Sequence, residues 1–280
     1  MSATPRAAPL GRDNLVLCAY TIPDATFEER VQAAADAGFS AISLRTRDYT
    51  IARDAGFTDS AVRALLHDHG LRVAELDVLW EWALGGERGE RARRQEDKLR
   101  AVATAVGARS INVLSEIEDP LEVVAERFAA LCDRCASDGL LAHIEFLPWS
   151  TVPDVATAAA IATLAGRPNG GILIDSWHHF RGPGGLEPLR ALDAGIVRAV
   201  QLSDAPARAE DDLLDETQHR RLLPGDGDLD LVGLVATLDA VGVDAPIGVE
   251  VFSDDLYRVA PRDAAAAAAA ATRRVLAAAR

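Results

Sequence analysis

Four oxygen-bearing side chains, three carboxylates and one amide, each lie at the end of a short apolar segment in the second half of the chain. The segment 172–174 is representative: it follows Gly170-Gly171, ends at Asp175, and has His178 three residues further on. A parallel strand covered on both faces is nearly all apolar, and parallel-barrel enzymes place their chemistry at the C-terminal ends of such strands. One such acid could simply cap a helix or pair with a base, but four in consecutive units indicate a shared site. They are Glu145, Asp175, Gln201 and Glu250.

Three carboxylates and one amide form a donor set made only of hard oxygen atoms. Such a set suits Mn²⁺ or Mg²⁺ better than Zn²⁺, which prefers nitrogen and sulfur ligands. Carboxylates that converge without a cation repel one another strongly, so a bound ion also explains how they can coexist. We therefore predict one Mn²⁺ or Mg²⁺ ion held by these four side chains.

The positions of these side chains follow from an unbroken alternation of apolar and helical segments. Alternation of this kind predicts a parallel sheet, and eight units in about 250 residues match a single α/β (β/α)₈ TIM barrel. An open doubly wound sheet is the alternative, but no G-x-G-x-x-G turn follows the first strand. We expect residues 1–13 to form a flexible tail and residues 14–280 one barrel domain. The expected strands are 15–20, 39–44, 71–78, 110–114, 140–146, 171–174, 196–202 and 246–251.

Composition narrows the class of partner. The chain has 280 residues, is 49% hydrophobic and carries a formal net charge of −14, which argues against nucleic acid or an anionic membrane as partner. It has no signal-peptide pattern and no apolar run of about 18 residues. Three cysteines without a framework indicate a reducing compartment, and Cys132-x-x-Cys135 falls in a helical segment, where two small buried residues are the simpler interpretation. We expect a cytoplasmic protein acting on a small molecule.

Five motifs carry a resemblance to a known family, and the resemblance covers about residues 15–275. They read H-I-E-F-L-P-W, G-I-L-I-D-S-W-H, V-Q-L-S-D, L-P-G-D-G-D and I-G-V-E-V. The chain resembles the xylose-isomerase-like TIM-barrel superfamily of sugar isomerases, epimerases and inosose dehydratases. The resemblance implies metal ligands at the ends of strands five to eight, at the four positions already named. Many epimerases of this family carry His where this chain has Gln201, which looks more like the dehydratase branch, for example the 3-dehydroshikimate dehydratases.

The resemblance also implies two substrate contacts. His178 matches the histidine that follows the strand-six acid by three residues and commonly contacts substrate. Arg208 is the nearest match to an arginine in the loop after strand seven, one residue out of register. The run His219-Arg220-Arg221 could bind a phosphate, but a solvated turn is the simpler interpretation.

Four further candidates each have two interpretations. His143 lies two residues before Glu145 and shares its face of the strand, so it is either an acid/base group or a buried core histidine. Trp149 and Trp177 could stack on a sugar ring or simply form the wall of the mouth. Glu75 could hold substrate hydroxyls or pair with Arg45.

These features predict an isomerase or epimerase acting on a sugar-like α-hydroxycarbonyl compound through a metal-stabilised enediolate. Glu145 and Glu250 would lie on opposite sides of the ion; either could take the proton, and the other, or His178, could return it. A dehydratase or lyase on the same site is the alternative, and a non-catalytic or partner-dependent subunit of a hetero-complex is a further one. A homo-oligomer and a small partner subunit are both compatible with the sequence.

Overall fold

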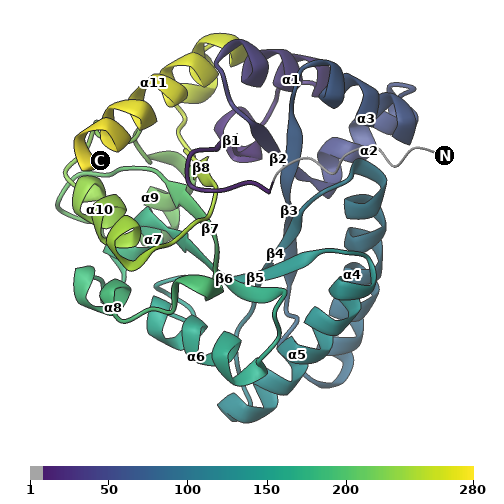
Figure 1. Ribbon diagram of the computed structural model, residues 1–280, viewed down its shortest axis with the longest axis vertical. Helices are drawn as coiled ribbons and strands as arrows, with labels where there is room; N and C mark the ends of the chain where they lie inside the picture. The colour runs from purple at the N-terminus through teal and green to yellow at the C-terminus, as the bar shows by residue number, and fades with distance from the viewer. Residues whose placement is uncertain (1–8) are drawn as a thin grey trace.

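Eight parallel strands close into a barrel in the order of the sequence, and β1 pairs with β8 to complete it (Figure 1). The computed structural model describes residues 9–280, and the predicted (β/α)₈ fold is confirmed. The strands are β1 (Leu15–Leu17), β2 (Ala41–Arg45), β3 (Arg72–Trp80), β4 (Ser110–Leu114), β5 (Leu141–Glu145), β6 (Gly170–Asp175), β7 (Val197–Leu202) and β8 (Ile247–Val249).

Helices form the outer layer of the barrel in Figure 1. They begin where the sequence supplies caps: the predicted capping box of Thr26 and Glu29 starts α1, since the Thr26 side chain accepts from the Glu29 N–H and Glu29 accepts from the Thr26 N–H. The longer helices are α1 (Phe27–Asp36), α3 (Asp59–Asp68), α4 (Gly86–Val106), α5 (Leu121–Ser137), α6 (Val155–Ala165), α10 (Leu231–Val241) and α11 (Pro261–Ala279).

Several short helices lie where no helix was predicted. α2 (Thr46–Asp54) follows β2 directly, α7 (Ser176–Arg181) follows β6 directly, and α9 (Leu213–His219) lies inside the polar excursion after β7. A further short helix, α8 (Leu186–Arg190), lies between β6 and β7. Cys132 and Cys135 lie on α5, and both thiols are free and fully buried.

The glycine pair that enters β6 permits a close approach of the chain. A Cβ atom on Gly171 would lie 2.1 Å from the carbonyl oxygen of Ile196, which immediately precedes β7. Every residue of β6 is buried, so neither strand can move aside. Gly171 therefore lets β6 and β7 pair, and that pairing places Asp175 opposite Gln201.

Residues 9–13 are not the loose tail that was predicted; residues 1–8 of that tail lie outside the described residues. Leu10 is only 4% exposed and packs with Val16, Ala41 and Ala74, on β1, β2 and β3. The backbone N–H of Arg12 donates to Asp244 at 2.9 Å. The correction arises because Leu10 finds its apolar partners on three different strands, which its local sequence does not reveal.

Candidate active site

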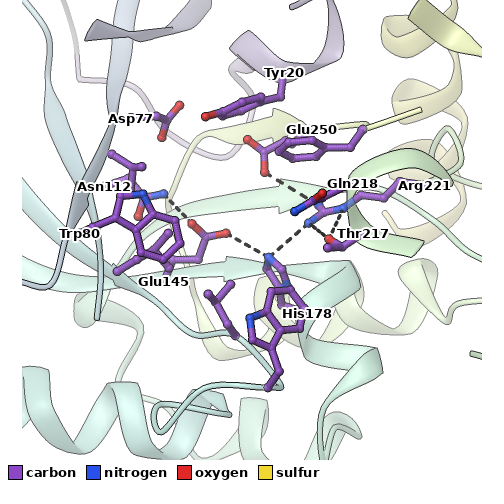
Figure 2. A pocket seen from close by; sticks show the side chains of 15 residues that line it. Tyr20, Asp77, Trp80, Asn112, Glu145, His178, Thr217, Gln218, Arg221 and Glu250 are labelled. Atoms are coloured by element: carbon purple, nitrogen blue, oxygen red, sulfur yellow. Dashed lines mark hydrogen bonds and ion pairs between the residues drawn. The ribbon is translucent and has the colours of Figure 1, made fainter. Parts of the chain in front are cut away.

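A cavity of about 360 Å³ opens where β3, β4, β5 and β8 end (Figure 2). Figure 2 shows Asp77 and Tyr20 on one side of it, Glu145 and His178 on the other, and Arg221 and Glu250 between them. The lining combines carboxyl groups with aromatic rings. It consists of Tyr20, Asp77, Val78, Trp80, Asn112, Leu114, Glu145, Leu147, Trp149, His178, Thr217, Gln218, Arg221, Glu250 and Phe252.

The barrel brings the four predicted metal-ligand side chains to this end of the sheet. Glu145 and Asp175 are the last residues of β5 and β6, Gln201 lies in β7, and Glu250 follows β8. All four are buried. Each of Glu145, Asp175 and His178 offers one ligand atom, and these three atoms lie within 4.8 Å of one another. The arrangement could therefore hold a divalent ion, with His178 as an additional nitrogen donor.

The Gln201 amide is oriented by Glu75. Its Nε2 donates to Glu75 Oε1 at 3.0 Å and to Glu250 Oε1 at 3.4 Å. Its Oε1 is buried and has no hydrogen-bond partner among residues 9–280. A buried amide oxygen without a partner costs free energy, and a hard cation is a suitable partner for it. The residues present therefore fit a divalent metal ion.

Glu145 is held on both of its oxygen atoms. Asn112 on β4 donates to Oε2 at 2.6 Å, and His178 Nε2 lies 3.4 Å from Oε1. The backbone N–H of His178 donates to Asp175 Oδ1 at 2.9 Å, so the strand-six acid also caps α7. These contacts fix the relative positions of Glu145, Asp175 and His178.

Arg221, from the excursion after β7, is the arginine that enters the cavity. It is 1% exposed, and its Nη1 donates to Asp175 Oδ2 at 2.8 Å and lies 3.9 Å from Glu250 Oε2. Its Nη2 lies 3.2 Å from His178 Nε2. For Arg221 the solvated-turn prediction is therefore wrong. The sequence hides this residue because its position depends on a distant backbone hydrogen bond, from the Arg221 N–H to the Phe252 oxygen at 2.9 Å.

Arg208, the arginine chosen from the sequence, lies elsewhere. It is exposed and lines a separate surface hollow together with Glu210, Asp212 and Arg220. Arg208 therefore does not line the cavity that contains Glu145 and His178, whereas Arg221 does.

Burial and mutual repulsion divide the carboxyl groups into two kinds. Burial, reinforced by the charge of Glu145, raises the pKa of Glu250 well above its usual range. Burial and the charge of Glu75 do the same to the pKa of Asp77. Burial alone would also raise the pKa of Asp175, but Arg221 and His178 hold it below its usual value. Asp175 is thus kept ionised, while Glu250 is able to carry a proton in the metal-free protein.

His143 and Glu75 are buried behind the cavity and do not line it. His143 Nε2 lies 3.2 Å from Glu75 Oε2. Burial lowers the pKa of His143 to about 3 and raises the pKa of Glu75 to about 7. His143 is accordingly a neutral core histidine, and Glu75 contacts Gln201. The structure does not support direct substrate contact by either residue.

Two tryptophans line the cavity, and only one of them was predicted to lie in the site. Trp149 is 38% exposed, with its ring centroid 5.4 Å from that of His178. Trp177 is fully buried, and its Nε1 donates to Glu216 at 3.1 Å, so it belongs to the wall behind Arg221. The second cavity tryptophan is Trp80, which is the last residue of β3 and is 47% exposed.

The sequence interpretation also missed Asp77, Asn112 and Tyr20. Asn112 could have been found, because it interrupts the otherwise apolar core of S-I-N-V-L, the sequence of β4. Asp77 was noticed near the end of β3 but given no role. Tyr20 carries no comparable signal.

Comparison with known proteins assigns the chain to a family. The family described as xylose isomerase-like TIM barrel matches residues 31–276, and the chain belongs to it. Among the described residues, no helix has the length and apolar character needed to cross a membrane.

Named relatives of the chain include a dehydratase and an isomerase. A 3-dehydroshikimate dehydratase of Pseudomonas aeruginosa is 30% identical over 247 residues, covering 86% of this chain and 38% of that protein. An inosose isomerase of Bacillus velezensis is 23% identical, covering 86% of this chain and 89% of the isomerase. The chain thus spans well under half the length of the dehydratase.

A solved structure shows the same fold with a metal. A crystal structure described as IOLI protein with a bound zinc atom has a TM-score of 0.86 and 19% identity, and the alignment covers 94% of this chain and 98% of the other. At that identity the likeness demonstrates the fold alone.

Proposed function

We propose that this chain is a divalent-metal-dependent isomerase or epimerase that moves a proton on the carbon beside the carbonyl of a sugar-like α-hydroxy ketone. The observation that carries the proposal is the convergence of one ligand atom each from Glu145, Asp175 and His178 within 4.8 Å of one another. It is supported by the buried amide oxygen of Gln201, which has no hydrogen-bond partner among the described residues. Mn²⁺ and Mg²⁺ suit the oxygen donors best, and the zinc in a structure of the same fold is consistent with a divalent site. The proposed ligands are Glu145, Asp175, Gln201 and Glu250.

When bound there, such an ion would act as a Lewis acid toward the carbonyl and neighbouring hydroxyl oxygens and lower the pKa of the adjacent C–H. Glu145 is suited to take that proton on Oε1, because Asn112 already occupies Oε2. Glu250, which also lines the cavity, is the group that we propose returns it. Positioned acid–base groups of this kind each contribute about 10²–10⁴-fold.

His178 and Arg221 complete the polar wall. Arg221 holds Asp175 ionised and keeps a positive charge beside His178. His178 Nε2 faces both Glu145 and Arg221, so it can donate to a substrate oxygen or relay a proton. Return of the proton to the neighbouring carbon gives isomerisation, and return to the opposite face gives epimerisation.

Elimination is the second candidate function, and two observations favour it. The family relatives include 3-dehydroshikimate dehydratases, and the chain carries Gln201 in β7. The first step is the same proton removal. If a hydroxyl or alkoxyl group lies β to the carbonyl, the electron pair released by the C–H bond expels it, and His178 can protonate the departing oxygen.

The cellular compartment and the need for a partner chain are also proposals. We propose a cytoplasmic enzyme on the strength of its three free cysteines. Because the chain spans only 38% of the dehydratase, activity that requires a partner chain is a further outcome to examine. Co-purification followed by an activity assay with and without the partner would reveal it.

The experiment is incubation of the Mn²⁺-loaded protein in D₂O with a panel of ketoses, inososes and keto-glycosides. We expect solvent deuterium at the carbon beside the carbonyl, detected by NMR, and its loss in Glu145→Gln. The exposed-site variant Glu126→Gln is the matched control and should behave as wild type. Failure of every α-hydroxy ketone to exchange or react, with the metal bound, would contradict the proposal.

A further inference from the structure

Carboxyl groups outnumber cationic side chains around the cavity. Asp77, Glu145 and Glu250 line it, and Asp175 and Glu75 lie buried behind them. Among residues 9–280, one arginine and no lysine line the same cavity. An anionic ligand would therefore meet several carboxyl groups and only one arginine. Each carboxyl group that is ionised would repel the ligand, and like charges placed together cost several kcal/mol.

The arginines near the cavity are already engaged. Arg221 donates to Asp175, and its other donors contact Thr217 at 2.8 Å and 3.1 Å. Arg45, whose guanidinium lies 5.1 Å from the Tyr20 ring centroid, forms a bidentate pair with Asp48 and donates to the Pro23 carbonyl. Recognition of a carboxylate or phosphate usually requires an arginine fork or a cradle of backbone N–H groups. No glycine is among the described residues that line the cavity, so such a backbone cradle is not evident either.

Aromatic rings form much of the remaining wall. Trp80 and Trp149 are 47% and 38% exposed although both face the cavity. Tyr20 and Phe252 are stacked, with ring centroids 4.5 Å apart. Large aromatic side chains gain free energy by covering an apolar ligand surface. Four such rings around one cavity, one of them in contact with His178, indicate an apolar ligand group near the reacting centre.

We infer that the substrate is an uncharged polyhydroxylated ketone that carries an aromatic or similarly flat apolar group, and not a carboxylate- or phosphate-bearing sugar. The ketone follows from the proposed function. The absence of a negative charge and the presence of an apolar group follow from the residues that line the cavity. A volume of about 360 Å³ lies within the range of about 300–1,000 Å³ typical of drug-sized ligands. That size leaves room for the apolar group beside the polyol.

The first test compares charge. Binding to the Mn²⁺-loaded protein is measured by calorimetry for an inosose, for 3-dehydroshikimate, which carries a carboxylate, and for fructose beside fructose 6-phosphate. We expect each neutral ligand to bind at least about tenfold more tightly than its anionic counterpart, a difference of about 1.4 kcal/mol. Equal or tighter binding of the anionic ligands would overturn the inference.

A gain-of-function variant sharpens this test. Gln218 is exposed and lines the cavity, so Gln218→Arg adds a cation without disturbing a buried contact. We expect it to raise the affinity for 3-dehydroshikimate about tenfold. Gln95→Arg, at an exposed position on α4, is the matched control and should not. An unchanged affinity in Gln218→Arg would contradict the claim that anions are excluded for want of a cation.

The second test compares apolar groups. A phenyl 3-keto-glucoside should bind wild type at least about tenfold more tightly than the methyl 3-keto-glucoside. Trp80→Ala should reduce this ratio, while Leu164→Ala, at an exposed apolar position outside the cavity, should preserve it. No phenyl preference in wild type, or an unchanged ratio in Trp80→Ala, would overturn the inference, and binding of a protein partner by Trp80 would then be the alternative.

Ligand affinity and deuterium exchange are measured separately, so failure of the inferred ligand class and failure of the proposed reaction can be told apart. Neutral, phenyl-preferring binding without deuterium exchange would refute the proposed reaction and support the inferred ligand class. Exchange of anionic ketones at least as fast as neutral ones would support the reaction and refute the ligand class. Absence of binding by every member of the panel would refute the ligand class.

Discussion

Gln201 and Glu75 show how a residue can belong to the site without contacting substrate. Glu75 was predicted as a possible substrate contact, but its Oε1 accepts from the Gln201 amide and its Oε2 lies beside His143. The amide oxygen of Gln201 is buried and has no hydrogen-bond partner among residues 9–280, so it is free to bind an ion. The interaction is typical of outer residues that orient metal ligands.

Glu75 also gives a pH-dependent prediction. Its folded-state pKa of about 7 lies above the usual 4.5 because of burial, so its stabilising contribution is present at low pH and is lost as pH rises through 7. In the metal-free protein, Glu75→Gln removes the ionisable group, so the variant does not lose stability through ionisation of residue 75 as the pH rises. The unfolding free energy of the variant relative to wild type should therefore rise by on the order of 1–3 kcal/mol between pH 5 and pH 8.

Urea unfolding in EDTA at pH 5, 6.5 and 8 measures this difference. Glu126→Gln, at an exposed position on α5, provides the control and should track wild type at all three values. If the difference in unfolding free energy between Glu75→Gln and wild type does not change with pH, burial does not raise the pKa of Glu75.

For individual residues, the sequence predicted which side chains lie at the site better than it predicted what each of them contacts. Glu145, Asp175, Gln201 and Glu250 were located because each lies at or next to the end of an apolar strand, which is a local pattern. Arg221 was missed because its burial depends on contacts with β6 and with residues beyond β8. Long-range contacts of this kind leave no periodicity in the local sequence.

Elements were predictable where their signals are local. The capping box of α1 was present in the sequence and in the structure, and all eight strands lie within a few residues of the predicted ranges. α2, α7 and α9 were missed because six to nine residues are too few to show helical periodicity. The packing of Leu10 was missed because its partners come from three separate strands.

The alanine-rich helix α11 supplies a prediction about packing. It packs along α1, and Ala268 is completely buried in the core while Ala267 is exposed. Ala268→Leu should lower the unfolding free energy by about 1–3 kcal/mol through overpacking. Ala267→Leu changes the same residue type by the same volume at an exposed position, so it should change stability little. Equal effects of the two substitutions in thermal unfolding would contradict this arrangement.

For the whole molecule, the barrel concentrates buried acids at one end of a chain whose net charge is already −14. Five buried carboxyl groups at or behind the cavity repel one another in the metal-free protein. A divalent ion that binds only the folded state stabilises it by mass action. The metal is therefore expected to contribute to stability as well as to chemistry.

Thermal unfolding with and without metal tests that expectation. Free Mn²⁺ at about 100 times its Kd should add about 2.7 kcal/mol, which corresponds to a rise in Tm of about 5–10 °C for a chain of this size. The rise should disappear with excess EDTA. A Tm that none of Mn²⁺, Mg²⁺ and Zn²⁺ raises would argue against a metal bound in the native barrel.

The most direct measurement is the stoichiometry and affinity of Mn²⁺ binding, by calorimetry and elemental analysis, in wild type, Glu145→Gln, Glu250→Gln and the control Glu126→Gln. The two glutamates are buried in the cavity wall, and Glu126 is exposed on α5. Wild type and Glu126→Gln should bind one ion, while Glu145→Gln and Glu250→Gln should bind it at least about 10–100-fold more weakly. Equal binding by all four proteins, or no binding by wild type, would contradict the metal site.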